Sequence, residues 1–203
     1  MVMKYGFYEM GVMIALVSFL GFVVENVWLA VTKGYFDNRN MNLPFLLGYG
    51  LALAAVWYTF GIPSETPLLS PLPEQARLPV YCVLMALCVS VGEVVLGRVT
   101  ERLCGIEYWN YSWIPFHITK YTSIPTSLGF GAMITLFMEH GFRPLMTAIS
   151  GMEERVLRVV SPVLLGMLAV DYLYCYGQMM KKHGFYEKWK RPVQWRRLRR
   201  RSI

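Results

Sequence analysis

The chain has 203 residues, of which 55% are hydrophobic and 16% are charged, and its formal net charge at pH 7 is +7. Soluble domains of this length carry more charge and fewer apolar residues, so the composition excludes an ordinary soluble fold and indicates a membrane protein. The positive charge lies mainly at the C-terminal end of the chain, where it bears on orientation in the bilayer.

Apolar residues occur in five near-continuous blocks, separated by short polar stretches that contain proline. The blocks are residues 10–31, 43–61, 78–97, 121–138 and 159–176. A helix needs about 20 residues to cross the hydrocarbon core of a bilayer, and each block is close to that length. We therefore predict an all-α membrane protein with about five transmembrane helices.

The distribution of basic residues predicts the orientation of these helices. Half of all Lys and Arg residues lie in the tail, residues 179–203, as Lys181, Lys182, Lys188, Lys190, Arg191, Arg196, Arg197, Arg199, Arg200 and Arg201. Cytoplasmic segments are enriched in Lys and Arg, so we expect residues 1–178 to form a transmembrane domain in the cell membrane, with a basic cytoplasmic tail and, given five spans, the N-terminus outside. Residues 32–42 and 98–120 are then also inside. Together with the tail, these cytoplasmic segments contain 15 of the 20 basic residues.

The basic tail also contains Trp189 and Trp195. Basic residues near a membrane surface attract anionic lipid headgroups by about 1 kcal/mol each, so we expect the lipid bilayer and its anionic headgroups as partners of the tail. Nucleic acid is not expected as a partner, because the sequence shows no nucleic-acid-binding domain beside the basic segment.

No motif in the sequence indicates catalysis or cofactor binding. The patterns G-x-x-x-x-G-K-[ST], G-x-G-x-x-G, H-E-x-x-H and G-x-S-x-G do not occur. The four cysteines form no C-x-x-C pair and have no zinc-ligand spacing, at Cys82, Cys88, Cys104 and Cys175. We therefore expect reduced thiols, no metal, no cofactor and no ATP hydrolysis by this chain.

Four features occur twice in the same order. Glu25 and Glu93 each precede a threonine by seven residues, and a loop asparagine, a Pro-Phe pair and a Gly-aromatic-Gly triplet follow. These features are Asn38, Pro44-Phe45 and Gly48-Tyr49-Gly50 in the first unit, and Asn110, Pro115-Phe116 and Gly129-Phe130-Gly131 in the second. We predict two parallel two-helix repeats, about residues 10–61 and 78–138, and a fifth helix at about 159–176. Chance similarity between apolar segments is the alternative.

Glu25 and Glu93 are predicted at equivalent depths, near the cytoplasmic ends of their helices. A carboxylate costs about 2.5–3.5 kcal/mol at the bilayer centre and less near an interface, so each must face a polar partner, a wet cavity or a proton. Other ionisable residues expected near this depth are Arg98, Glu101, Arg102 and Asp171. The two arginines are expected to supply counter-charge, with a local Arg98–Glu101 pair, and Asp171 to join the same cluster. Such a cluster is either a structural ion network or a site for a proton, an ion or a substrate.

The segment 107–117 is the most aromatic in the chain. Trp109, Tyr111 and Trp113 are predicted at the headgroup level, in an aromatic belt or a re-entrant loop. Alternatively, the polar residues of this region line an entrance; they are Asn110, Ser112, His117 and Lys120. His117 has no second histidine at ligand spacing, which favours a hydrogen-bonded interfacial residue over a metal ligand.

Several of these motifs also match a known family. They are Glu25, Asn38-Arg39, the segment 44–50, Glu93, Glu101, Trp109-Asn110-Tyr111-Ser112 and the polar stretch through Ser127. With them, roughly residues 10–140 resemble the CmpB-like family of small membrane proteins, labelled "putative ABC-transporter type IV", to which some vertebrate multi-pass proteins are similar. The family often has Gly where Asn40 stands and Asp where Asn110 stands. The resemblance implies a helical membrane fold.

The leading functional hypothesis is a permease-like component of transport, with Glu25, Glu93 and Glu101 as polar or proton-coupling groups. Such a component would work with a separate ATPase or another membrane protein, or it would use an ion gradient. The alternatives are a structural or regulatory protein that binds lipid or a helical partner, and an enzyme acting on lipid headgroups. Candidate site residues are Glu25, Asn38, Arg39, Glu93, Arg98, Glu101, Arg102, Asn110, His117 and Asp171.

Overall fold

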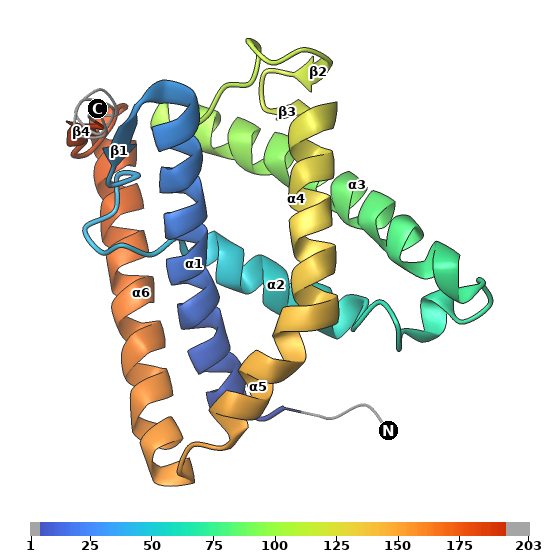
Figure 1. The fold of residues 1–203 in the computed structure, drawn as a ribbon. Helices are drawn as coiled ribbons and strands as arrows, with labels where there is room; N and C mark the ends of the chain where they lie inside the picture. The colour runs from blue at the N-terminus through green and yellow to red at the C-terminus, as the bar shows by residue number, and fades with distance from the viewer. Residues whose placement is uncertain (1–4, 194–203) are drawn as a thin grey trace, which may run out of the picture.

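The computed structural model describes residues 5–193, which fold mainly into α-helices (Figure 1). The helices are α1 (Phe7–Lys33), α2 (Leu47–Thr59), α3 (Glu74–Cys104), α4 (Ile124–Leu136), α5 (Phe142–Ser150) and α6 (Glu154–Lys182). A short 3₁₀ turn, Pro67–Leu69, precedes α3, and a π-helical turn, Phe137–Gly141, joins α4 to α5. The prediction of a mainly helical fold is confirmed.

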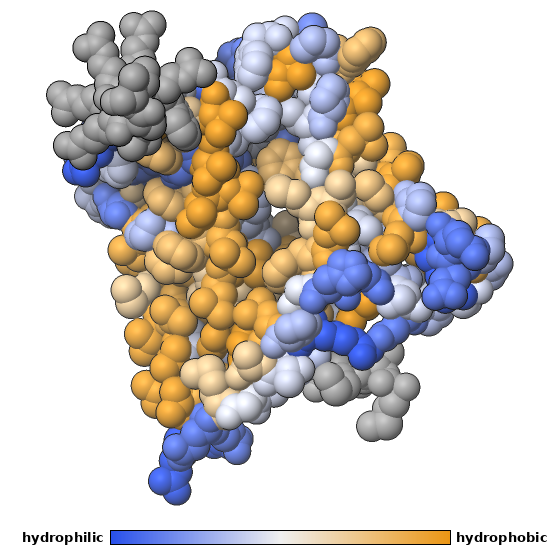
Figure 2. All heavy atoms as spheres, viewed as in Figure 1, coloured by the Kyte–Doolittle hydropathy of each residue, from blue (hydrophilic) through white to orange (hydrophobic). Residues whose placement is uncertain are grey.

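Three helices are long and apolar enough to cross a membrane, namely α1, α3 and α6. At about 1.5 Å per residue, the 27 residues of α1 span about 40 Å, more than the hydrocarbon thickness of about 30 Å. Val31, Val170 and Leu173 are 71%, 69% and 69% exposed, and an apolar surface runs along α1 and α6 in Figure 2. Apolar side chains at this exposure are suited to contact with lipid.

All three long helices finish at the same end of the molecule, the upper end in Figure 1. Residues 34–41, 105–123 and 183–193 lie at or near that end, whereas residues 42–46 descend beside α1 and α6. The glycines that follow α1 and α3, Gly34 and Gly105, take left-handed backbone conformations with φ of 73° and 67°. Glycine adopts such angles without steric cost, so both helices end where the sequence provides it.

The other two predicted spans correspond to shorter helices. α2 and α4 have 13 residues each, about 20 Å at the helical rise. α2 begins only at Leu47 because the preceding loop descends beside α1, where the amide of Leu46 donates to the carbonyl of Ser18 (2.9 Å). The count of five spans stays a prediction.

Two glycines allow close approach within the helix pairs. A methyl group added at Gly50 of α2 would overlap the backbone of α1 at Ile14, and one at Gly131 of α4 would overlap the backbone of α3 at Cys82 and Ala86. α2 therefore packs directly on α1, and α4 directly on α3.

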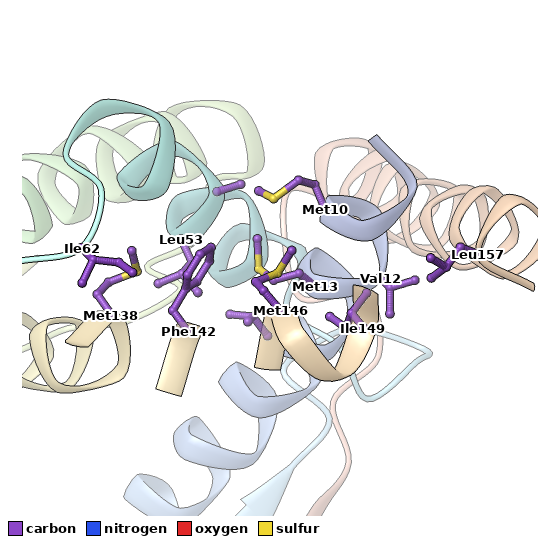
Figure 3. Close-up of a cluster of buried hydrophobic side chains, with 12 residues drawn as sticks. Met10, Val12, Met13, Leu53, Ile62, Met138, Phe142, Met146, Ile149 and Leu157 are labelled. Carbon is purple, nitrogen blue, oxygen red and sulfur yellow. The ribbon is translucent and has the colours of Figure 1, made fainter. Parts of the chain in front are cut away.

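The largest apolar core lies toward the lower end in Figure 1, and Figure 3 shows its side chains in close-up. It brings together α1, α2, α5, α6 and the π-helical turn through Met10, Val12, Met13, Val17, Leu53, Ala54, Ile62, Met138, Phe142, Met146, Ile149 and Leu157. Trp57 stacks on Phe142 with ring centroids 4.5 Å apart. Methionine is flexible and polarisable, so it fills the irregular space where α4 bends into α5.

Two pairs of short strands lie at the upper end of the molecule. The all-α prediction did not include them. β1 (Tyr35–Asp37) pairs antiparallel with β4 (Lys190–Pro192), and β2 (His117–Thr119) with β3 (Thr122–Ser123). The first pair ties the tail segment to the loop after α1. The tail residues Trp195, Arg196, Arg197, Arg199, Arg200 and Arg201 lie outside the described residues.

Candidate functional site

Glu25 of α1 and Arg39 of the following loop form an ion pair near the upper end. Their closest charged atoms are 3.4 Å apart, and the Glu25 and Arg39 side chains are only 18% and 9% exposed. The hydroxyl of Tyr49 in α2 donates a hydrogen bond to the Glu25 carboxylate (2.6 Å). Glu25 is therefore partnered by both a cation and a phenol.

Arg39 is held in place from several directions. Its guanidinium lies 5.3 Å from the ring centroid of Tyr108, whose hydroxyl donates to the Arg39 carbonyl. Burial works against its charge, but Glu25, Tyr108 and Asp37 outweigh that effect and raise the pKa of Arg39 above its ordinary value. Its Nε is buried and has no hydrogen-bond partner among the described residues.

Asp37 organises the backbone around this pair. It is fully buried; its amide donates to Asn26 Oδ1 (2.9 Å), and its carboxylate accepts from the amide of Arg39 (3.0 Å). Lys188 of the tail segment lies 3.7 Å from the same carboxylate. Asn38 donates to the carbonyl of Glu187 (3.1 Å), so the predicted Asn38-Arg39 motif also anchors the tail.

Glu93 of α3 has a different environment. Its carboxyl group interacts with the hydroxyls of Tyr111 and Thr122, and Glu25 is close enough to interact with it electrostatically. Its Oε2 is buried without a hydrogen-bond partner, and no ion pair involves Glu93 among the described residues. Glu25 and Glu93 are thus near enough to interact electrostatically, and of the two only Glu25 has a counter-charge among the described residues.

Tyr111 connects the two glutamates. Burial raises its pKa, and the negative charges of Glu25 and Glu93 raise it further. The phenol therefore stays protonated and can donate a hydrogen bond to a carboxylate. The headgroup level predicted for Tyr111 stays a prediction, and the phenol was not predicted as a partner of the two acids.

A cavity of about 60 Å³ opens beside this cluster, room for a few water molecules or one small ion. Its walls come from the end of α1, the loop after it, the aromatic segment and the tail, through Glu25, Trp28, Leu29, Lys33, Tyr35, Arg39, Tyr108, Trp109, Asn110, Tyr111, Trp113 and Lys188. Within residues 5–193, no group of three or more His, Cys, Asp or Glu side chains could hold a metal ion.

Glu101 belongs to a separate, more exposed cluster. Lys120 donates to both Glu101 and Glu107 at 2.7 Å, and Asn110 donates to Glu107 (2.7 Å). The hydrogen bond from Lys120 lowers the pKa of Glu107. Exposed ion pairs contribute little to stability, so this cluster mainly orients the β2–β3 segment over the end of α3.

Arg98 and Arg102 do not supply the counter-charge that their spacing suggested. Both are exposed and form no ion pair within the described part of the chain. Glu101 pairs instead with Lys120, because the β2–β3 segment folds back over the helix and brings in a cation from 19 residues away. His117 is exposed, with its Nδ1 3.2 Å from the carbonyl of Ile114.

Asp171 has its own partners and does not pair with the glutamates. Its carboxylate accepts from the amide of Leu43 (3.1 Å) and from the side chain of Asn42 (2.9 Å). Irregular backbone at membrane depth must find internal hydrogen bonds, and Asp171 supplies one to the descending loop. Asp171 thus stabilises the segment before α2.

Several residues of the cluster were missed from the sequence. Tyr49, Tyr108 and Thr122 were not predicted as partners of the acids, and Asp37 was not singled out. One signal was available: the Gly-aromatic-Gly triplets differ by a hydroxyl, Tyr49 against Phe130. A phenol inside an apolar block needs a partner, and Glu25 lies in the preceding helix of that unit.

Comparison with known proteins places the chain in a sequence family. A family model described as "Putative ABC-transporter type IV" matches residues 12–176, which include the whole Glu25–Glu93 cluster except the tail lysine. Neither the comparison with curated proteins nor that with solved structures found a match.

Proposed function

Because the chain belongs to the family described as "Putative ABC-transporter type IV", we propose that it is a permease-like component of a membrane transport system. The observation that carries the proposal is the unequal pair of acids between the two helix pairs. Glu25 is neutralised by Arg39, whereas the nearby Glu93 has no cation partner among the described residues. An intramembrane carboxyl group without a counter-charge is suited to bind a proton or a cation.

The proposed topology has five crossings, with α2 and α4 as returning segments. The N-terminus is outside the cell membrane and the tail cytoplasmic. The shared upper end of α1, α3 and α6 supports this arrangement, since it gathers the basic segments 32–42, 98–120 and 183–193 on one side. The positive-inside rule makes that side the cytoplasmic one.

The proposal includes two repeated hairpins, α1–α2 and α3–α4. The contacts of Gly50 and Gly131 support it: Ile14 and Cys82, which they touch, each precede the glutamate of their unit by 11 residues. The loops of the two units are also similar. In each unit, the residue that follows the loop asparagine interacts with the glutamate of the same unit. This residue is Arg39 in the first unit and Tyr111 in the second.

The repeat explains why the two glutamates differ. Equivalent loop positions carry a cation in one unit and a phenol in the other, so one acid is fixed as an ion pair and the other keeps a free oxygen. Tyr111 interacts with Glu93 and also lines the cavity. Glu93 is therefore the proposed coupling group, Tyr111 its hydrogen-bond donor, and Glu25–Arg39 a fixed wall of the site.

The proposed energy source is either an ion gradient or a separate ATPase. The sequence contains no phosphate-binding loop of its own. If the family description extends to mechanism, a cytosolic ATPase should co-purify with the chain, and its recovery should require the upper-end loops that face the cytoplasm.

Glu93→Gln is expected to abolish proton movement by the reconstituted chain. The amide keeps the size of the side chain but cannot exchange a proton, so flux should fall to the leak of empty liposomes. The measurement is acidification of liposomes containing a trapped pH-sensitive dye, driven by a potassium diffusion potential. Glu74→Gln, an exposed change in the first turn of the same helix, is the matched control and should keep wild-type flux. Equal flux in wild type and Glu93→Gln, or none above empty liposomes in wild type, would contradict the proposal.

A structural or regulatory role is the second candidate, and one observation favours it. Glu25, Glu101 and Asp171 each have well-placed partners, as in a network that holds helices and loops together. Under this alternative, Glu93 also serves the fold. Its replacement would then lower stability, and the reconstituted chain would carry no flux to lose.

A further inference from the structure

The cavity at the upper end is lined by cations from three separate segments. Lys33 comes from the last turn of α1, Arg39 from the loop, and Lys188 from the tail. Glu25 is the one carboxylate among the lining residues, and it is already paired with Arg39. The lining thus carries more positive than negative charge.

Further cations lie close to this wall. Lys190 stacks 4.7 Å from the ring centroid of Tyr35, which also lines the cavity. Burial lowers the pKa of Lys188, and repulsion from Arg39, Lys190 and Lys33 lowers it further, although Asp37 acts in the opposite direction. The acids present therefore leave part of the positive charge unbalanced.

Arg39 has donor capacity left. It is 7% exposed, it lines the cavity, and its buried Nε has no hydrogen-bond partner in the described part of the chain. A buried donor without an acceptor is costly, and a ligand oxygen would satisfy it. The planar guanidinium suits oxyanions such as phosphate, to which it can donate in parallel.

Three tryptophans border the same cavity. Trp28 and Trp113 are 41% and 55% exposed. Trp109 is partly buried, and its indole N–H donates a hydrogen bond to the carbonyl of Tyr121 (2.9 Å). Tryptophan side chains prefer the headgroup level of a bilayer. The cavity is therefore placed where headgroup phosphates occur, and it remains open to phosphate from solution.

From this geometry we propose that the cavity binds a phosphate-type anion through Lys33, Arg39 and Lys188. Its source is either the headgroup of an anionic lipid or free phosphate. The volume of about 60 Å³ admits such a group. This binding is independent of transport, since it requires only the fixed wall of the site and not a reaction of Glu93.

The test uses the full chain in a phosphate-free, non-ionic detergent. Titration with inorganic phosphate should change the tryptophan fluorescence until the signal saturates. A control titration with chloride at the same ionic strength, without sulfate, should leave the fluorescence unchanged. In a second arm, nanodiscs of phosphatidylglycerol or phosphatidylcholine are compared by the lipid retained after extraction. If phosphate binding saturates but phosphatidylglycerol is not retained, the ligand is a free anion. If phosphatidylglycerol is retained but phosphate does not bind, the ligand is a lipid headgroup. If both are observed, the site accepts either source.

Lys33→Gln is the decisive variant, because Lys33 is exposed and has no ion-pair partner in the described part of the chain. Its loss should weaken binding about fivefold, the effect of one basic residue near the surface. Lys33→Gln with Lys188→Gln should weaken binding about 25-fold on the same basis. Arg155→Gln, at a 93% exposed side chain near the start of α6, should leave binding unchanged. Absence of binding in both arms, or equal binding by Lys33→Gln and wild type, would overturn the inference.

Discussion

Arg39→Gln is expected to destabilise the protein by about 3 kcal/mol, because it leaves Glu25 charged, largely buried and without a cation. Glu25→Gln should cost a similar amount by leaving the Arg39 guanidinium unpaired. The measurement is the free energy of unfolding in mild detergent with increasing denaturant. The two replacements act on the same pair, so their effects should not add.

The double variant Glu25→Gln with Arg39→Gln provides the control. It removes both charges and should recover part of the stability that either single change loses. Arg158→Gln breaks an exposed pair with Glu154, whose charged atoms are 2.7 Å apart, and should lower stability far less than either change at the buried pair. A loss for Arg39→Gln no greater than for Arg158→Gln would show that the buried pair does not hold the loop.

Gly50→Ala and Gly131→Ala are each expected to destabilise the protein by about 3 kcal/mol or more. In both positions the added methyl group meets backbone of the partner helix, which cannot move aside as a flexible side chain can. The helix pair must therefore separate, and apolar contacts along it are lost. Thermal unfolding followed by helical circular dichroism measures the effect.

Gly48→Ala and Gly129→Ala are matched controls, since each is the first glycine of the same triplet and an added methyl group meets nothing within 4 Å. Both should leave stability unchanged or slightly raised, because alanine favours a helix. If Gly48→Ala were as damaging as Gly50→Ala, the loss would reflect backbone conformation in α2 and not contact between helices.

The sequence was sufficient to predict the long helices and to single out two acids within them. Long apolar blocks define α1, α3 and α6, since length and hydropathy alone decide whether a helix can cross a bilayer. Glu25 and Glu93 were singled out because a carboxylate inside such a block requires a partner. Both arguments depend on local sequence, which explains their success.

The partners of those acids could not be read from spacing. Arg98 and Arg102 are near Glu93 and Glu101 in sequence, yet the cation beside Glu25 is Arg39 and the cation beside Glu101 is Lys120. Both cations lie on loops that fold back over helix ends. Such a return depends on contacts between distant residues, and helical periodicity does not encode it.

The shortness of α2 has a similar cause. The apolar block 43–61 predicted a helix from its first residue, but residues before Leu47 remain irregular. Their backbone groups are satisfied by Asp171 and Ser18, which lie on other helices. Hydropathy indicates that a segment is buried in the protein or in lipid. It does not distinguish a helix from a loop whose backbone hydrogen bonds are made with neighbouring residues.

The thermal unfolding temperatures of Glu93→Gln and Glu25→Gln distinguish a functional from a structural role for Glu93. Glu93 is expected to serve function and not the fold, because its buried Oε2 has no hydrogen-bond partner among the described residues. Removing an uncompensated carboxylate should leave the unfolding temperature equal to or above that of wild type, while Glu25→Gln lowers it. A fall for Glu93→Gln as large as that for Glu25→Gln would contradict this expectation and favour a structural role for both acids.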